Sequence, residues 1–179
     1  MFSFLDRDKG RQKKAREKHG RDESAVASGT EITYKKSLIS KYHEEHENLL
    51  LLFGQALSAY QQARDGEFLA HLRDLHIALR KHLLDEELNL YIYLRHCYRN
   101  DKNKQELITR FKKSSKKTSV ATFTYIKQLT EEAEMISRDE AFISQLLQIG
   151  NMLETLLAAE EQHLYPIYKK PVGTAELSF

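Results

Sequence analysis

Two residues four positions apart, His82 and Glu86, give the sequence its most direct chemical signal. Residues at this spacing lie on one face of an α-helix, close enough for both side chains to bind the same ion. An imidazole with a carboxylate suits iron, manganese or zinc, whereas calcium takes oxygen ligands. The same spacing is also common in ordinary ion pairs, so the pair indicates a metal site only if neighbouring helices supply further ligands.

Long helices are the natural elements to position such ligands, because only 2 prolines and 7 glycines interrupt the 179 residues. Apolar residues recur at intervals near 3.6 in four long stretches, each of which predicts a helix with one apolar face. The predicted helices cover about 34–64, 67–98, 104–136 and 140–168. Helices of this length with short connections predict an all-α fold, an antiparallel up-down-up-down four-helix bundle.

Local signals place the ends of these helices. Asp65-Gly66 is expected to end the first helix, and the polar run 99–103 to connect the second to the third. The lysine-rich stretch 112–117 is expected to weaken the middle of the third helix, whose apolar face includes Val120. The spacing from Ser137 to Glu140 predicts a capping box that opens the fourth helix.

Three segments of the chain differ in composition. Residues 6–29 are dense in charged side chains and serine, so ordering them would bury almost nothing to offset the lost chain entropy. We therefore expect a flexible, charged N-terminal arm at 1–33, one bundle domain at 34–170 and a C-terminal tail at 171–179. An alternative interpretation of the arm is a small docking element that begins at Phe2.

Composition disfavours several classes of protein. The 28 basic and 26 acidic residues nearly balance, which disfavours a nucleic-acid partner. The longest run of aliphatic and aromatic residues, 49–53, is far shorter than the roughly 20 residues of a membrane helix. A single cysteine, Cys97, and the lack of a signal-peptide pattern predict a soluble cytoplasmic protein. No phosphate-binding loop or activated nucleophile is evident, so we do not predict an enzyme.

A repeated pattern, EExxLY, resembles the motifs of the hemerythrin-like HHE family. The two copies and their surroundings read His82-x-x-x-Glu86-Glu87-x-x-Leu90-Tyr91 and Leu156-x-x-x-Glu160-Glu161-x-x-Leu164-Tyr165-Pro166. The segment from Glu45 through His46 to Leu49 is similar to the opening histidine motif of the same family. The resemblance covers roughly residues 38–168, and its most specific part is the recurrence of EExxLY in two predicted helices.

The resemblance implies an iron site with an incomplete set of ligands. The implied metal ligands in this chain are His46, His82, Glu86 and Glu160. Family histidines are missing at Leu156 and on the third helix, near Ser119, because residues 98–162 contain no histidine. The resemblance therefore implies one iron ion or none instead of a symmetric pair. It further implies an oxygen- or redox-responsive binding or sensing module.

His163 is an alternative ligand, because Glu160-Glu161-Gln162-His163 has the ExxH spacing of ferritin-like di-metal bundles. No second copy of that spacing accompanies it, and His163 lies about 10 Å of helix rise beyond Leu156. His71 lies about 16 Å along the helix from His82, too far to share an ion with it. Three further histidines are expected at the surface or in ordinary hydrogen bonds: His43, His76 and His96.

A second hypothesis is a metal-free regulatory bundle that binds a protein partner through an exposed helix face or through the N-terminal arm. The missing ligands, the basic stretch 112–117 and the charged arm motivate it. Residues 149–154 and Glu161 also carry a fainter resemblance to the bacterial regulator of sigma D family, another helical bundle. Nucleic-acid binding by the arm and residues 112–117 is a third hypothesis, which the balanced charge disfavours.

Overall fold

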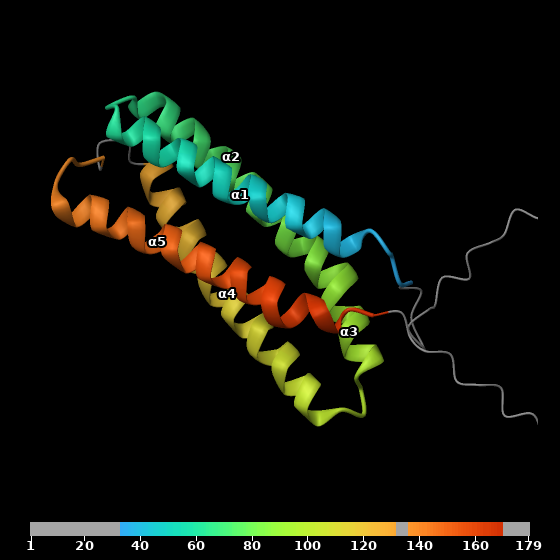
Figure 1. The fold of residues 1–179 in the computed structure, drawn as a ribbon. Coiled ribbons are helices and arrows are strands. Elements are labelled where there is room, and N and C mark those ends of the chain that lie inside the picture. The colour runs from blue at the N-terminus through green and yellow to red at the C-terminus, as the bar shows by residue number, and fades with distance from the viewer. Residues whose placement is uncertain (1–32, 132–135, 170–179) are drawn as a thin grey trace, which may run out of the picture.

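The computed structural model describes residues 33–131 and 136–169, and these are almost wholly helical (Figure 1). The elements are α1 (Leu38–Gln61), α2 (Asp65–Asp85), η1 (Glu86–Tyr91), α3 (Ile92–Cys97), α4 (Lys102–Glu131), α5 (Glu140–Ala159), η3 (Glu160–Leu164) and η4 (Tyr165–Ile167). The predicted all-α class is confirmed. The predicted N-terminal arm, apart from Thr33, and the C-terminal tail lie outside the described residues.

Four helical rods pack around a common core (Figure 1). One rod is α1, the second runs without a break through α2, η1 and α3, the third is α4, and the fourth runs through α5, η3 and η4. α1 packs against α2 and α5, and α4 packs against the same two neighbours. Each rod therefore has one face turned toward the other three. No helix among residues 33–131 and 136–169 is long and apolar enough to cross a membrane.

The turn between α1 and α2 comes earlier than predicted. Ala63 takes a left-handed φ of 56°, its N–H donates to the Tyr60 carbonyl at 3.0 Å, and the Arg64 N–H donates to the Ala59 carbonyl at 2.9 Å. These bonds form a Schellman motif, in which glycine is the usual residue at the position of Ala63. The prediction that residues 65–66 end the first helix is wrong, because they begin α2 instead.

The start of α5 also differs from the prediction. Asp139 is the N-cap: its Oδ1 accepts the N–H of Phe142 at 2.7 Å. The Ser137 hydroxyl donates instead to the other carboxylate oxygen of Asp139, at 2.6 Å. The predicted capping box is therefore wrong, because a carboxylate two residues nearer the helix takes the orphan N–H and also suits the positive end of the helix dipole.

α4 runs unbroken through the lysine-rich stretch 112–117, so the predicted weak point is wrong. The lysines lie on the outer side of the helix, while Phe111, Ser115 and Thr118 are buried on the inner side. Lysine is a good helix former, and this segregation leaves the inner face intact. Val120, predicted to be part of the apolar face, is 55% exposed.

Two hydrophobic clusters fill the core, with a polar layer between them. On α1, Tyr42 belongs to one cluster and Leu49 to the other, with His46 between them. The same order recurs around His82 and Glu86 in the second rod, and around Glu160 in the fourth. α4 places buried hydroxyl residues at the corresponding positions: Ser115, Thr118, Ser119 and Thr122. The polar layer thus crosses the whole bundle.

Gly150 has a packing role on α5. A Cβ atom at this position would come within 2.3 Å of the Phe53 ring of α1. A side chain here would therefore force the ring of Phe53 to move. This contact explains the glycine in the segment that resembles the regulator of sigma D family without any reference to a partner protein.

Candidate metal centre

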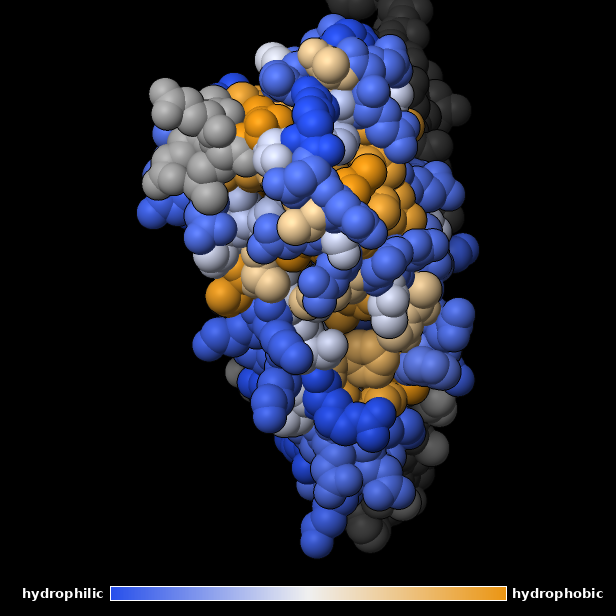
Figure 2. Space-filling view, turned by 90° about the vertical axis from the view of Figure 1, so that its left-hand side faces the viewer, coloured by the Kyte–Doolittle hydropathy of each residue, from blue (hydrophilic) through white to orange (hydrophobic). Residues whose placement is uncertain are grey.

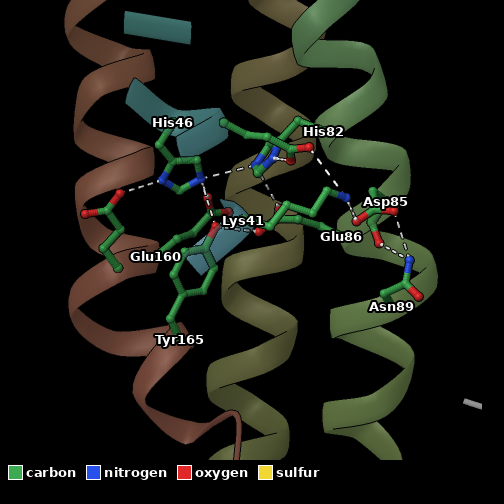
Figure 3. Close-up of polar contacts among 10 residues, drawn as sticks. Lys41, His46, His82, Asp85, Glu86, Asn89, Glu160 and Tyr165 are labelled. Carbon is green, nitrogen blue, oxygen red and sulfur yellow. Dashed lines mark hydrogen bonds and ion pairs between the residues drawn. The ribbon is translucent and has the colours of Figure 1, made fainter. Parts of the chain in front are cut away.

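The four predicted ligands come together at the centre of the bundle (Figure 3). His46 lies on α1, His82 on α2, Glu86 at the start of η1 and Glu160 at the start of η3. Each is at most 2% exposed, and one ligand atom from each lies within 4.8 Å of the others. Residues separated by up to 114 positions thus form one buried cluster, as expected for a metal site inside a helix bundle.

Both glutamates of the cluster open a π-helical turn. η1 begins at Glu86 and η3 begins at Glu160, so each EExxLY copy forms the same local structure. Such turns are rare and often occur at functional sites. The tyrosine that ends each copy reaches the first glutamate of the other: Tyr165 donates to Glu86 at 2.9 Å, and Tyr91 donates to Glu160 at 3.5 Å. The two motifs therefore support one another across the core.

Carboxylates at the edge of the cluster fix the histidine tautomers. The Nδ1 atom of His46 lies 2.8 Å from Glu161, and the Nδ1 atom of His82 lies 2.8 Å from Glu45. A carboxylate only accepts hydrogen bonds, so each Nδ1 carries the proton and each Nε2 presents a lone pair. A histidine that binds a metal is commonly held in this way. Both lone pairs point into the cluster, where the two Nε2 atoms are 3.1 Å apart.

Two carboxylate oxygens in the cluster have no hydrogen-bond partner. They are Oε2 of Glu86, 3.7 Å from Nε2 of His82, and Oε2 of Glu160, 3.8 Å from Nε2 of His46. A buried polar atom without a partner is unfavourable by about 1–3 kcal/mol. Four groups with lone pairs thus converge with few protons among them. A cation satisfies all four at once.

The charge states of the cluster suit a metal site. Burial and the neighbouring His82 together lower the pKa of His46 to about 4, so His46 is neutral at pH 7. A neutral imidazole is the form that binds metals. Burial raises the pKa of Glu86 and of Glu160, and the charge of Glu86 raises that of Glu160 further. A bound cation would replace the protons that such carboxyl groups otherwise hold.

Lys41 holds the outer carboxylate of the second rod in place. Its ammonium group lies 2.7 Å from Asp85 and 3.5 Å from Glu45, the residue that orients His82 (Figure 3). Burial acts to raise the pKa of Asp85, but the hydrogen bond and positive charge of Lys41, together with smaller contributions from neighbouring groups, outweigh it, so that this pKa is lowered. Glu45 is therefore positioned by a cation on one side and by a histidine on the other.

Sequence reasoning found the four central residues but missed those that orient them. Glu45 and Glu161 directly adjoin a predicted ligand, and Tyr91 and Tyr165 end the EExxLY motifs. The repeat itself was the available signal, because it contains the second glutamate and the tyrosine in both copies. Their roles depend on which rods are neighbours, and a single sequence does not specify that.

The positions that lack a family histidine do not contribute a substitute. Leu156 is buried and apolar, one helical turn before Glu160. The Ser119 hydroxyl donates to the Lys116 carbonyl of its own helix. His163 is exposed and lies outside the cluster, so the structure does not favour the alternative ExxH site. His76 stacks on Phe123, with ring centroids 4.7 Å apart.

Comparisons with family models, with curated proteins and with solved structures gave no match to this chain. The resemblance to hemerythrin-like proteins therefore stays a prediction from the motifs. The geometry of the cluster is the observation on which a functional proposal rests.

Proposed function

We propose that this chain is a hemerythrin-like, up-down-up-down bundle that binds one iron ion through His46, His82, Glu86 and Glu160. In this proposal it is an oxygen- or redox-responsive binding or sensing module of the cytoplasm and not an enzyme. Iron supplies the response, because the bound ion can change its oxidation state. One observation carries the proposal: two unprotonated imidazole nitrogens and two unpartnered carboxylate oxygens lie together in the buried core.

The mixture of donors favours a transition metal such as iron over magnesium or calcium. Two neutral imidazoles with carboxylates match the ligand types of non-haem iron sites, whereas magnesium and calcium favour oxygen alone. A single ion follows from the distribution of these donors: three of the four come from the first and second rods, and α4 supplies none among its described residues. The up-down-up-down topology is supported by the short turn at 62–64 and by the short loop before α4.

The test is metal content. Full-length protein expressed with iron supplied, and purified without air, should contain about one iron per chain by elemental analysis. The variant His82→Ala, Glu86→Ala should contain none, because it removes half of the donors. The matched control His163→Ala, Glu154→Ala removes an exposed histidine and an exposed glutamate and should keep the iron. Wild-type protein without a transition metal would overturn the proposal.

A second candidate function, binding of a protein partner, has one specific observation in its favour. A groove of about 550 Å³ lies along α2 and α4, and Ile77 and Leu84 are 67% and 60% exposed in it. Its rim carries Arg73, Arg80 and Lys81, and no acidic side chain lines it. The apolar floor of the groove suits the apolar face of an amphipathic helix from a partner, and the cationic rim suits acidic side chains on that helix. Figure 2 shows one face of the molecule, on which hydrophobic residues reach the surface in patches between hydrophilic ones.

The groove can be tested with a matched pair of variants. Wild-type protein used as bait in a bacterial lysate should retain a stoichiometric partner through an acidic segment of that partner. Ile77→Glu, Leu84→Glu should lose it, while Leu50→Glu, Leu51→Glu, which changes exposed leucines on α1, should not. Added salt should weaken the interaction. Equal retention by all three baits would exclude the groove as the binding surface.

A further inference from the structure

The hydroxyl group of Tyr165 lies inside the cluster of candidate ligands. Tyr165 is 3% exposed and begins η4, directly after the π turn that holds Glu160. Its oxygen lies 2.8 Å from Nε2 of His46 and 2.9 Å from Oε1 of Glu86 (Figure 3). The phenol oxygen thus contacts one candidate ligand from the first rod and one from the second.

The number of protons does not match the number of contacts. The Nδ1 proton of His46 serves Glu161, so its Nε2 atom is an acceptor. When Glu86 is ionised, as a metal ligand must be, its Oε1 is an acceptor as well, and a phenol has a single proton to donate. One of the two short contacts therefore brings two lone pairs together. A cation bound between these three atoms would make both contacts favourable.

The spacing of these atoms is that of neighbouring metal ligands. With metal–ligand bonds of about 2.1 Å, two adjacent ligands of an octahedral ion lie about 3.0 Å apart. The contacts from Tyr165 to His46 and Glu86, at 2.8 and 2.9 Å, and that between the two histidines, at 3.1 Å, are close to this value. Four residues thus present atoms at the spacing of one coordination sphere, and the fifth, Glu160, places Oε2 3.8 Å from Nε2 of His46.

Tyr91, the counterpart of Tyr165 in the other motif, lacks this environment. Its oxygen lies 3.5 Å from Oε1 of Glu160, which is its only hydrogen-bond partner among the described residues. The first rod faces Tyr165 with His46, whereas α4 has no histidine at all. The two tyrosines end identical motifs and differ in what the neighbouring rod presents to them. Comparison of Tyr91 with Tyr165 therefore separates the effect of the motif from the effect of the neighbouring rod.

We propose that Tyr165 is a fifth protein ligand of the metal and binds it through its phenolate oxygen. As the bond between this oxygen and the ion forms, the phenol proton is released to solvent. Tyrosinate is an established ligand of protein-bound iron. As an anionic oxygen it balances the charge of a ferric ion better than that of a ferrous ion, so it would favour the oxidised form. This inference rests on the proposed iron site.

The test is the colour of the ferric protein. Wild-type protein loaded with ferrous iron without air, then oxidised by ferricyanide, which takes one electron per iron, should show visible absorption from phenolate-to-iron charge transfer. Resonance Raman spectra excited in this band should contain tyrosine ring modes, and these should shift when the protein is grown with ring-deuterated tyrosine. The control Tyr125→Phe, which removes a buried hydroxyl that has no hydrogen-bond partner and lies away from the candidate ligands, should keep the band. Tyr165→Phe should lose it while it still binds iron.

Each outcome decides one question. Iron without a phenolate band in wild-type protein would overturn the role of Tyr165 and leave the proposed iron site intact, whereas no iron would overturn both. A band that survives in Tyr165→Phe would also overturn it. Affinity alone would not separate the possibilities, because a residue that only hydrogen-bonds to a ligand also changes affinity about 10- to 100-fold. If Tyr165→Phe does not fold, shifted ring modes in the labelled wild-type spectrum still show that a tyrosine binds the iron, and Tyr165 is the described tyrosine whose oxygen contacts two candidate ligands.

Discussion

The two EExxLY motifs share a sequence and an opening π turn but differ in their surroundings. Each begins a π turn with a buried glutamate and ends with a tyrosine directed at the other motif. One helical turn before Glu86 stands a histidine, and one turn before Glu160 stands a leucine. The second glutamates differ as well: Glu161 orients His46, whereas Glu87 pairs with Lys112 at the surface. A symmetric scaffold thus carries a one-sided set of donors.

The comparison separates two requirements of a metal site. The π turns and tyrosines place carboxylates in the core, and both halves of the bundle meet this requirement. The second requirement is a set of nitrogen donors, which the histidines supply, and among the candidate ligands only α1 and α2 provide them. Variants that make one half resemble the other should therefore change metal binding in opposite directions.

The largest effect is expected when the second rod is given the leucine of the fourth. His82→Leu removes a buried nitrogen donor and leaves its partner Glu45 without a histidine to orient. We expect iron content to fall from about one per chain to almost none, because the remaining set has a single imidazole. Elemental analysis of protein purified without air measures this. Full iron content in the folded variant would show that His82 is no ligand.

The reverse substitution, which gives the fourth rod the histidine of the second, should strengthen metal binding. Leu156→His places an imidazole one turn before Glu160, as His82 stands before Glu86. Without metal, the new buried polar group should lower the free energy of unfolding by about 1–3 kcal/mol. With iron supplied, the metal content should rise above that of wild type, and the loss of stability should be reversed. Urea unfolding with and without iron measures the difference, and equal curves for the metal-loaded and metal-free variant would contradict it.

The second glutamates offer a matched pair of smaller changes. Glu161→Ala removes the acceptor that fixes the tautomer of His46, so iron affinity should fall about 10- to 100-fold. Glu87→Ala removes only the ion pair between Glu87 and Lys112. Because these side chains are 39% and 37% exposed, the change should leave iron affinity nearly unchanged. Titration with a competing chelator gives both values. An equal loss of iron affinity in the two variants would show that both second glutamates contribute equally to metal binding.

The smallest expected effect is on the turn that joins α1 to α2. Ala63→Gly should raise the free energy of unfolding by up to about 1 kcal/mol, because glycine adopts the left-handed φ of 56° without strain. The gain is limited by the greater freedom of glycine in the unfolded chain. Urea unfolding should show the increase with iron content unchanged. A loss of stability would mean that the alanine methyl group makes packing contacts worth more than the strain.

The sequence was sufficient to predict the four helices and the four central side chains of the site. The helices follow from apolar periodicity, and the spacing from His82 to Glu86 fixes a shared helix face. The full set of four candidate ligands was implied by the resemblance to the hemerythrin-like family. The EExxLY repeat supplied Glu160, and the opening motif supplied His46. These signals are local and therefore visible in one sequence.

The features that escaped prediction depend on tertiary structure or on close competition between alternatives. The left-handed turn at Ala63 occurs although a glycine stands three residues later, and the cap at Asp139 displaces Ser137. The lysine-rich stretch 112–117 was expected to weaken the third helix. Its lysines could be assigned to the outer face only once the neighbours of α4 were known. The directions of Tyr91 and Tyr165 follow from π turns, which apolar periodicity does not reveal.

The polar layer between the two hydrophobic clusters has a consequence for cooperativity. Two buried carboxylate oxygens in this layer have no partner, so the contact between the two clusters is weakest there and we expect the two regions of the metal-free bundle to open independently. A bound ion would tie the rods together at this level and make the two regions unfold as one. We expect iron to slow amide hydrogen exchange near Leu49 in one cluster and near Leu90 in the other by similar factors. The site would then govern the motions of the whole bundle, from one end to the other.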